Sequence, residues 1–230
     1  MMKSSKKACI IGTGRSGTTF TAKALSKGGR EVGHETMGKD GIVSWCLVAD
    51  GADSLYGPSW SALSDLDLVV GHQLRHPLDS IMSLMTVHSN SRAFIERSGI
   101  GDFRHQKKLL GWCMVHWLSW NQFAYEKADF HWTLDNVETG ILPMFDALEW
   151  DIDDAEWKRM CQLTSNTRNA AKSRVEWKRI HRTPPRVFAR RLQHAYFPVE
   201  KSWQSLADID VILTQEIKSF YDTFRCLTTS

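Results

Sequence analysis

The sequence predicts an α/β fold in which helices cover both faces of a parallel sheet. Short apolar runs, typical of buried strands, alternate along the chain with longer segments of helical periodicity. This alternation favours parallel strands joined by helical crossovers, in a three-layer arrangement. A third observation is the glycine-rich turn "GTGRSGTT" at residues 12–19, which follows the first apolar run. Because parallel sheets bind ligands at the carboxyl ends of their strands, we expect the functional site at this turn.

Each element follows from the apolar pattern and the residues that interrupt it. Pro77 suits the first turn of a helix, where its missing N–H has no partner to lose. The polar stretch 89–104 is expected to be a loop. The expected strands span residues 8–11, 30–34, 67–74 and 130–134. The expected helices span residues 18–27, 77–85 and 106–128, with a helix or helical turn at 41–49.

The size and charge of the chain narrow the possible functions. A chain of 230 residues, 42% of them hydrophobic, can bury one sizeable core, so we expect a single domain over residues 1–230. A net charge of +3 is too small to predict nucleic-acid binding. It is compatible with a cleft that attracts a small anion.

The cysteines and the start of the chain indicate a reducing compartment. The five cysteines are scattered without the paired spacing of a zinc site, and the histidines have no metal-ligand spacing either, so we expect core thiols and no metal. The apolar run in "MMKSSKKACIIG" is too short for a signal peptide, and no segment approaches a membrane span. We therefore expect a cytoplasmic protein without a membrane span.

The turn at residues 12–19 has the composition of an anion cradle. Gly12, Gly14 and Gly17 allow backbone conformations that bring successive N–H groups onto one ligand. The helix that follows adds the positive end of its dipole. Phosphate is the anion that this arrangement favours.

One interpretation of the turn is the nucleotide-hydrolase loop GxxxxGK[ST]. Gly12 and Gly17 have the required spacing, but Thr18 stands where that loop has its lysine. No apolar strand ends in an aspartate placed to hold magnesium, so the parts needed for phosphoryl transfer are missing.

A second interpretation is a dinucleotide site, because Gly12, Gly14 and Gly17 spell GxGxxG between a strand and a helix. Glu35 lies at about the sequence distance where an acid binds a ribose. This interpretation leaves Arg15, Thr18 and the later segment "RHPLDSIMS" unexplained, and a lone GxGxxG is weak support for an NAD-dependent oxidoreductase.

Two segments together give a third interpretation. "GRSGTTF" at residues 14–20 and "RHPLDSIMS" at residues 75–83 resemble the two cofactor-binding segments of the sulfotransferase family. Members of that family transfer a sulfuryl group from 3'-phosphoadenosine-5'-phosphosulfate (PAPS) to an acceptor. The resemblance covers residues 8–88 and is weak beyond them. It implies a P-loop nucleotide-hydrolase-like sulfotransferase fold that needs no metal.

The resemblance also implies roles for individual residues. The first segment would bind the 5'-phosphosulfate, with Arg15 stabilising charge on the leaving phosphate and Phe20 stacking on the adenine. Arg75 and Ser83 of the second segment would bind the 3'-phosphate. Arg168, in the basic stretch 164–174, is a candidate for completing that site. The expected cofactor-binding residues are Gly14, Arg15, Ser16, Gly17, Thr18, Thr19, Phe20, Arg75, Ser83 and Arg168.

Transfer also requires a base for the acceptor's proton. Carbohydrate-type members of the family place a carboxylate after the second strand, which makes Glu35 the first choice and His34 the second. Successive side chains of a strand point to opposite faces, so both reach the site only if the strand has ended. The acceptor would be a hydroxyl or amine of a small molecule or glycan, for which Trp45 and Trp60 are candidate platforms or core residues. A non-catalytic nucleotide-binding module remains an alternative.

Overall fold

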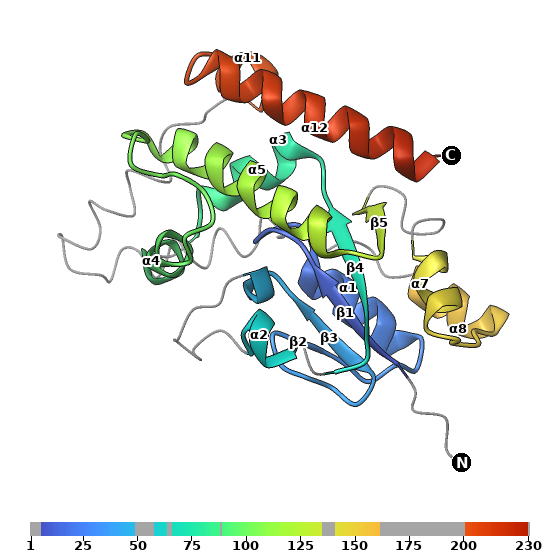
Figure 1. The fold of residues 1–230 in the computed structure, drawn as a ribbon. Helices are drawn as coiled ribbons and strands as arrows, with labels where there is room; N and C mark the ends of the chain where they lie inside the picture. Colours follow the sequence, from blue (N-terminus) through green and yellow to red (C-terminus); the bar gives the residue numbers. More distant parts are fainter. Residues whose placement is uncertain are drawn as a thin grey trace, which may run out of the picture.

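The computed structural model describes residues 6–48, 58–63, 66–87, 89–134, 141–161 and 201–229. Its centre is a five-stranded sheet with the order β2-β3-β1-β4-β5, and every neighbouring pair is parallel (Figure 1). This confirms the α/β class and is compatible with a P-loop-like α/β fold. The strands are β1 (Lys7–Ile11), β2 (Val32–His34), β3 (Gly41–Ser44), β4 (Leu68–Leu74) and β5 (Phe130–Thr133).

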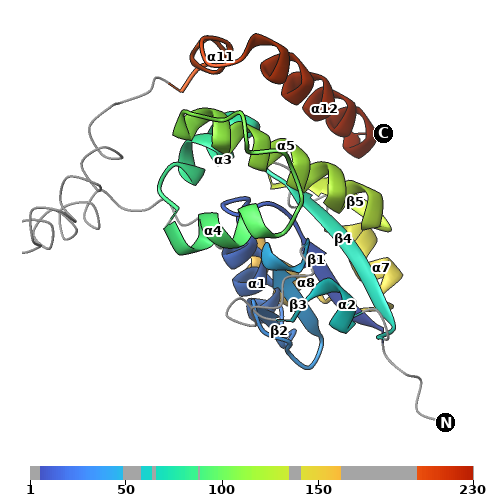
Figure 2. The ribbon, with the colours of Figure 1, turned by 60° about the vertical axis from the view of Figure 1, so that its left-hand side comes forward.

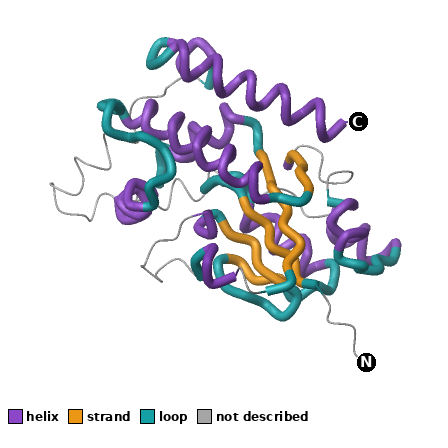
Figure 3. Tube along the Cα trace, in the orientation of Figure 1, coloured by secondary structure: helices purple, strands orange, loops and turns teal. Residues whose placement is uncertain are grey.

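Helices lie on both sides of this sheet, as the tube in Figure 3 makes visible. Among the described residues, none of them is long and apolar enough to cross a membrane. In chain order they are α1 (Thr18–Lys27), the 3-10 helix η1 (Cys46–Val48), α2 (Trp60–Leu63), α3 (Pro77–Leu84), α4 (Ser89–Arg97), α5 (Leu109–Lys127), α7 (Leu142–Ala147), α8 (Asp154–Cys161), α11 (Trp203–Ala207) and α12 (Val211–Thr229).

The alternation of side chains along β1 separates the two faces of the sheet. Ala8 and Ile10 pack into a cluster with side chains of α1, α7 and α8. Cys9 and Ile11 point to the opposite face, where they meet side chains of α2 and α5. All four side chains are fully buried. The sheet is therefore covered on both faces, which explains why its strands read as continuous apolar runs.

The long helix α5 is the centre of the second face. Trp117 and Trp120 are completely buried in it, and apolar residues occupy most of its circumference. A helix that is apolar all round is a core helix, and α5 is covered by α3 on one side and by α11 and α12 on another (Figure 2). Trp112, Trp117 and Trp120 thus belong to the core.

The prediction for residues 41–49 was wrong at its start. Residues Gly41–Ser44 form β3, and only Cys46–Val48 are helical. All four residues of β3 are buried, so the segment lacks the alternation that distinguishes a strand. The Ser44 hydroxyl accepts a hydrogen bond from the backbone N–H of Cys46 at 3.0 Å, where the strand gives way to the helical turn.

The prediction of a loop over residues 89–104 was also wrong in its first half. Residues Ser89–Arg97 form α4, whose sequence is mostly polar. Phe94 and Ile95 are the buried residues of this helix, and both pack into the core around α5. Two adjacent apolar residues are enough to dock a short helix but leave little periodicity in the sequence.

Among the four cysteines whose side chains the structure describes, three follow the expectation of core thiols. Cys9, Cys46 and Cys113 are buried, and burial raises the pKa of the Cys9 thiol to about 12. Cys226 is exposed on α12, so its assignment to the core was wrong. It lies toward the C-terminal end of α12, a helix that presents only one face to α5.

Candidate functional site

The loop between β1 and α1 lies at a topological switch point of the sheet. β1 leads into α1 on one face, whereas the neighbouring strand β4 leads through α3 to α5 on the other. Chain segments that leave adjacent strands in opposite directions open a crevice outside the carboxyl ends of those strands. The glycine loop follows β1, and Arg75 follows β4, so both lie at the edge of the sheet where such folds bind ligands.

The loop conformation depends on its glycines. Gly17 begins α1 with a φ of 98°, which is left-handed, and it provides no side-chain cap for the helix. A Cβ on Gly12 would lie 2.5 Å from the carbonyl oxygen of Gln73, so only glycine fits there. Arg15 also has a positive φ, 70°, at the centre of the loop. The first turn of α1 therefore presents backbone N–H groups and a positive dipole end to a ligand.

Gln73, which sequence analysis missed, fixes the loop against β4. Its side-chain amide donates a 2.7 Å hydrogen bond to the carbonyl oxygen of Ser16, and its amide oxygen accepts a hydrogen bond from the Thr21 hydroxyl. Gln73 is fully buried. The available signal was a polar residue near the end of an otherwise apolar strand, because such a residue needs partners inside the protein.

Three of the predicted phosphate-binding residues come together in the structure. The Arg15 Nε–H donates to Ser83 Oγ at 2.9 Å, and an Arg75 N–H donates to the carbonyl oxygen of Arg15 at 3.2 Å. Among the described residues, no carboxylate forms an ion pair with Arg75. Two guanidinium groups therefore lie beside the helix N-terminus, which is an arrangement suited to an anion.

The position of the Arg15 side chain refines the expectation from the sequence. We expected it to lie beside the leaving phosphate, but its hydrogen bond joins it to Ser83 in α3, the expected 3'-phosphate side. The left-handed backbone of Arg15 turns the chain at this residue. The guanidinium thus links the two sequence segments directly.

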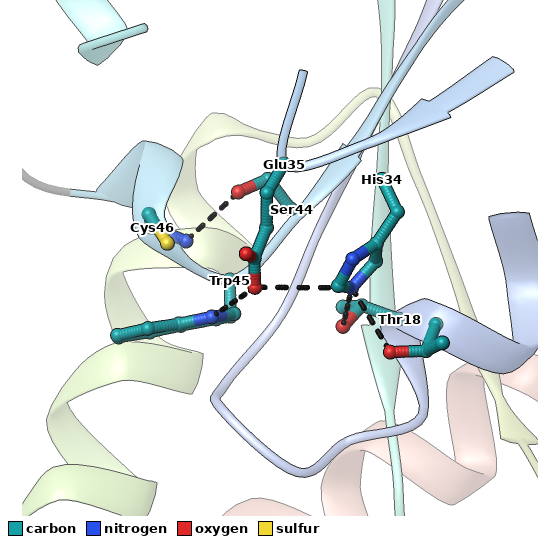
Figure 4. A network of polar contacts seen from close by, with 7 residues as sticks. Thr18, His34, Glu35, Ser44, Trp45 and Cys46 are labelled. Carbon is teal, nitrogen blue, oxygen red and sulfur yellow. Dashed lines mark hydrogen bonds and ion pairs between the residues drawn. The ribbon is translucent and has the colours of Figure 1, made fainter. Parts of the chain in front are cut away.

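His34 and Glu35 both face the loop, because β2 ends at His34 (Figure 4). Glu35 has a φ of 60°, and this left-handed turn breaks the alternation of the strand. The two side chains lie near each other, with 3.9 Å between His34 Nε2 and Glu35 Oε1. The strand has thus ended before Glu35, as required for the side chains of His34 and Glu35 to reach the same site.

The surroundings of His34 favour its neutral form. His34 Nε2 lies 3.2 Å from the Thr18 hydroxyl and 3.1 Å from the Thr19 hydroxyl, both at the start of α1. Partial burial lowers the pKa of His34, the Glu35 carboxylate opposes that shift, and Lys23 adds to it. A neutral imidazole can accept hydrogen bonds from these hydroxyls and so tie β2 to α1.

Glu35 is oriented by an indole. The Trp45 Nε1–H donates to Glu35 Oε1 at 2.7 Å, as the dashed line in Figure 4 marks. The Trp45 carbonyl in turn accepts a 2.7 Å hydrogen bond from Trp120 of α5. Glu35 Oε2 accepts no hydrogen bond from the described residues, and the side chain is 35% exposed. The carboxylate thus keeps one oxygen for a ligand while the other is held.

The remaining predicted residues lie as follows. Ser16 and Thr18 are buried, Thr19 is exposed, and Phe20 is partly buried in the first turn of α1. Trp60 is the first residue of α2 and packs against the apolar cluster that contains Cys9 and Ile11. Of the two proposed platform tryptophans, Trp45 is the one with a hydrogen bond to a candidate site residue, Glu35. His72 is fully buried, and its Nε2 lies 3.0 Å from Oδ1 of Asn121 in α5.

Two further sequence predictions concern Arg168 and metal binding. Arg168 lies outside the described residues. The part of the chain that the structure describes has no group of three or more His, Cys, Asp or Glu side chains arranged to hold a metal ion.

In comparisons with known proteins, no family model, curated protein or solved structure matches this chain. The chemistry of the site therefore rests on its own residues: a glycine loop at a helix N-terminus with two arginines beside it, and a partly exposed, indole-bound carboxylate.

Proposed function

We propose that this protein is a sulfotransferase that moves a sulfuryl group from PAPS to a hydroxyl or amine of a small-molecule or glycan acceptor. The observation that carries the proposal is the direct contact between the two segments that resemble the family. Arg15 bonds to Ser83, 68 positions away, and Arg75 bonds to Arg15, 60 positions away. Both contacts lie outside the carboxyl ends of adjacent parallel strands, where such sheets bind ligands.

The residues present fit a bisphosphorylated nucleotide. The Ser16 hydroxyl is buried in the loop and has no hydrogen-bond partner among the described residues. The loop and the start of α1 suit one phosphate, and Arg75 with Ser83 suits a second. A second phosphate site beside the first distinguishes adenosine 3',5'-bisphosphate from ATP and NAD.

The strand order weighs against the dinucleotide alternative. In the common dinucleotide fold, the second strand lies directly beside the first, and its terminal acid reaches the ribose. Here β3 separates β2 from β1. Glu35, at the end of β2, is bound to Trp45. The acid is therefore better placed for an acceptor than for a ribose.

The proposed mechanism divides the work among these groups. When bound, PAPS supplies the electrophilic sulfur and a bisphosphate leaving group. Glu35 accepts the proton of the acceptor through its second carboxylate oxygen, and Trp45 holds the first oxygen. The loop N–H groups at the start of α1 stabilise negative charge on the departing phosphate, while Arg15, Arg75 and Ser83 hold the 3'-phosphate. Alignment of acceptor and donor supplies the rest of the acceleration.

Calorimetric titration with adenosine 3',5'-bisphosphate tests the donor class. We expect this ligand to bind more tightly than either NAD or ATP with magnesium, because only it offers a phosphate to both halves of the site. Preference for NAD or for magnesium ATP would refute the sulfotransferase assignment.

Arg75→Ala is expected to weaken binding of the bisphosphate by about 1.5 to 3 kcal/mol, the usual contribution of a hydrogen bond to a charged group. The same titration measures the change. Arg104→Ala is the matched control, since Arg104 is an exposed arginine paired with Asp102. If both variants bind as tightly as the wild type, Arg75 does not hold a phosphate.

A further inference from the structure

His116 occupies the middle of α5 and is fully buried. Neither of its ring nitrogens has a hydrogen-bond partner among the described residues. Buried polar groups in native proteins nearly always have a partner, because leaving one without destabilises the folded state. Both ring nitrogens of His116 are therefore left for a partner outside the described residues.

The packing around His116 keeps its ring fixed and neutral. The imidazole stacks on Trp112 at a centroid distance of 5.4 Å and meets Trp120 edge-on at 4.6 Å. Burial lowers the pKa of His116 to about 3. At neutral pH the ring therefore has one N–H donor and one acceptor nitrogen, held by two indoles.

The Nε2 atom of His116 faces the glycine loop. A Cβ built on Gly14 would lie 3.7 Å from this nitrogen, 3.7 Å from Trp45 and 3.5 Å from Leu84. Trp45 is the residue that holds the Glu35 carboxylate. The indole that holds the candidate base and the unpartnered imidazole therefore lie against the same side of Gly14.

This arrangement assigns different positions to the 3'-phosphate and to the sulfuryl group of a bound donor. Arg75 and Ser83 contact Arg15 and suit the 3'-phosphate. The group next to the base must be the one that is transferred, because the acceptor has to lie between Glu35 and the sulfur. In PAPS, that group is the terminal sulfuryl group.

We propose that the Nε2–H of His116 donates a hydrogen bond to an oxygen of the sulfuryl group as it lies against Gly14. The inference rests on the proposed function and adds a donor-positioning residue to it. His116 keeps its proton throughout, so no bond to hydrogen is made or broken at this residue. A neutral donor suits a sulfuryl group, which carries less charge than a phosphoryl group.

The test compares two nucleotides that differ in the sulfuryl group. Dissociation constants for PAPS and for adenosine 3',5'-bisphosphate are measured by calorimetry for the wild type, His116→Phe and His116→Gln. We expect His116→Phe to weaken PAPS binding about 3- to 10-fold, as for one lost hydrogen bond, with bisphosphate binding changed less than about 2-fold. His116→Gln can place an amide N–H near the Nε2 position and should recover much of the loss.

A measurement on the wild type guards against a variant that fails to fold. The nitrogen-15 resonance of His116 Nε2 should shift on addition of PAPS and shift much less with the bisphosphate. Equal weakening of both nucleotides in a folded His116→Phe, or no Nε2 shift with PAPS, overturns the inference and leaves the proposed function standing. Failure of the wild type to bind either nucleotide refutes both.

Discussion

Glu35→Gln is expected to lower the rate of sulfuryl transfer by about 100-fold or more, the usual scale for removing a general base. Its affinity for adenosine 3',5'-bisphosphate should stay close to that of the wild type. Trp45 donates to one oxygen of Glu35, and a glutamine oxygen can accept the same hydrogen bond. The substitution therefore keeps the shape of the site and removes the basic oxygen.

The rate is measured as formation of the bisphosphate from PAPS with an acceptor that the wild type uses. Glu31→Gln is the matched control, because Glu31 is an exposed carboxylate just before β2. Equal loss of turnover in both variants would mean that general charge, and not proton transfer, explains the effect. Unchanged turnover in Glu35→Gln would leave His34 as the candidate base, or support a non-catalytic nucleotide-binding module.

Local sequence patterns predicted the elements that pack one face against the core or that begin and end at a glycine or proline. The α1 boundaries, Thr18–Lys27, agree with the sequence prediction, because Gly17 and Gly28 interrupt the pattern on either side. β3 was missed because a strand buried on both faces lacks alternation. The helix α4 was missed because its docking depends on only two buried residues.

The candidate site could be predicted only in part. The glycine loop and the segment "RHPLDSIMS" were visible as motifs, and the parallel pairing of β1 with β4 brings them together. The left-handed conformation of Glu35 depends on where β2 ends and is not encoded in a local pattern. The sequence did not distinguish His116 from the other histidines, since its lack of partners among the described residues is a property of the packed core.

The free energy of unfolding is expected to fall by about 4 kcal/mol between about pH 7.5 and pH 5 through His72 and His116, at about 2 kcal/mol each. Burial lowers the pKa of both imidazoles to about 3, with the Asn121 hydrogen bond opposing the shift at His72. The unfolded chain protonates them near pH 6.5, but the folded protein does not, so the unfolded state binds more protons below that pH. Stability is therefore complete above about pH 6.5 and is lost progressively on acidification.

Urea unfolding at a series of pH values measures this dependence, and single variants separate the two histidines. His116→Gln should reduce the pH-dependent loss by about 2 kcal/mol, because an amide does not titrate. A wild-type profile that is flat between about pH 7.5 and pH 5 would mean that these imidazoles titrate as readily in the folded protein as in the unfolded chain. In that case α5 must open to water at His116, and the rigid, neutral donor that faces Gly14 would not exist.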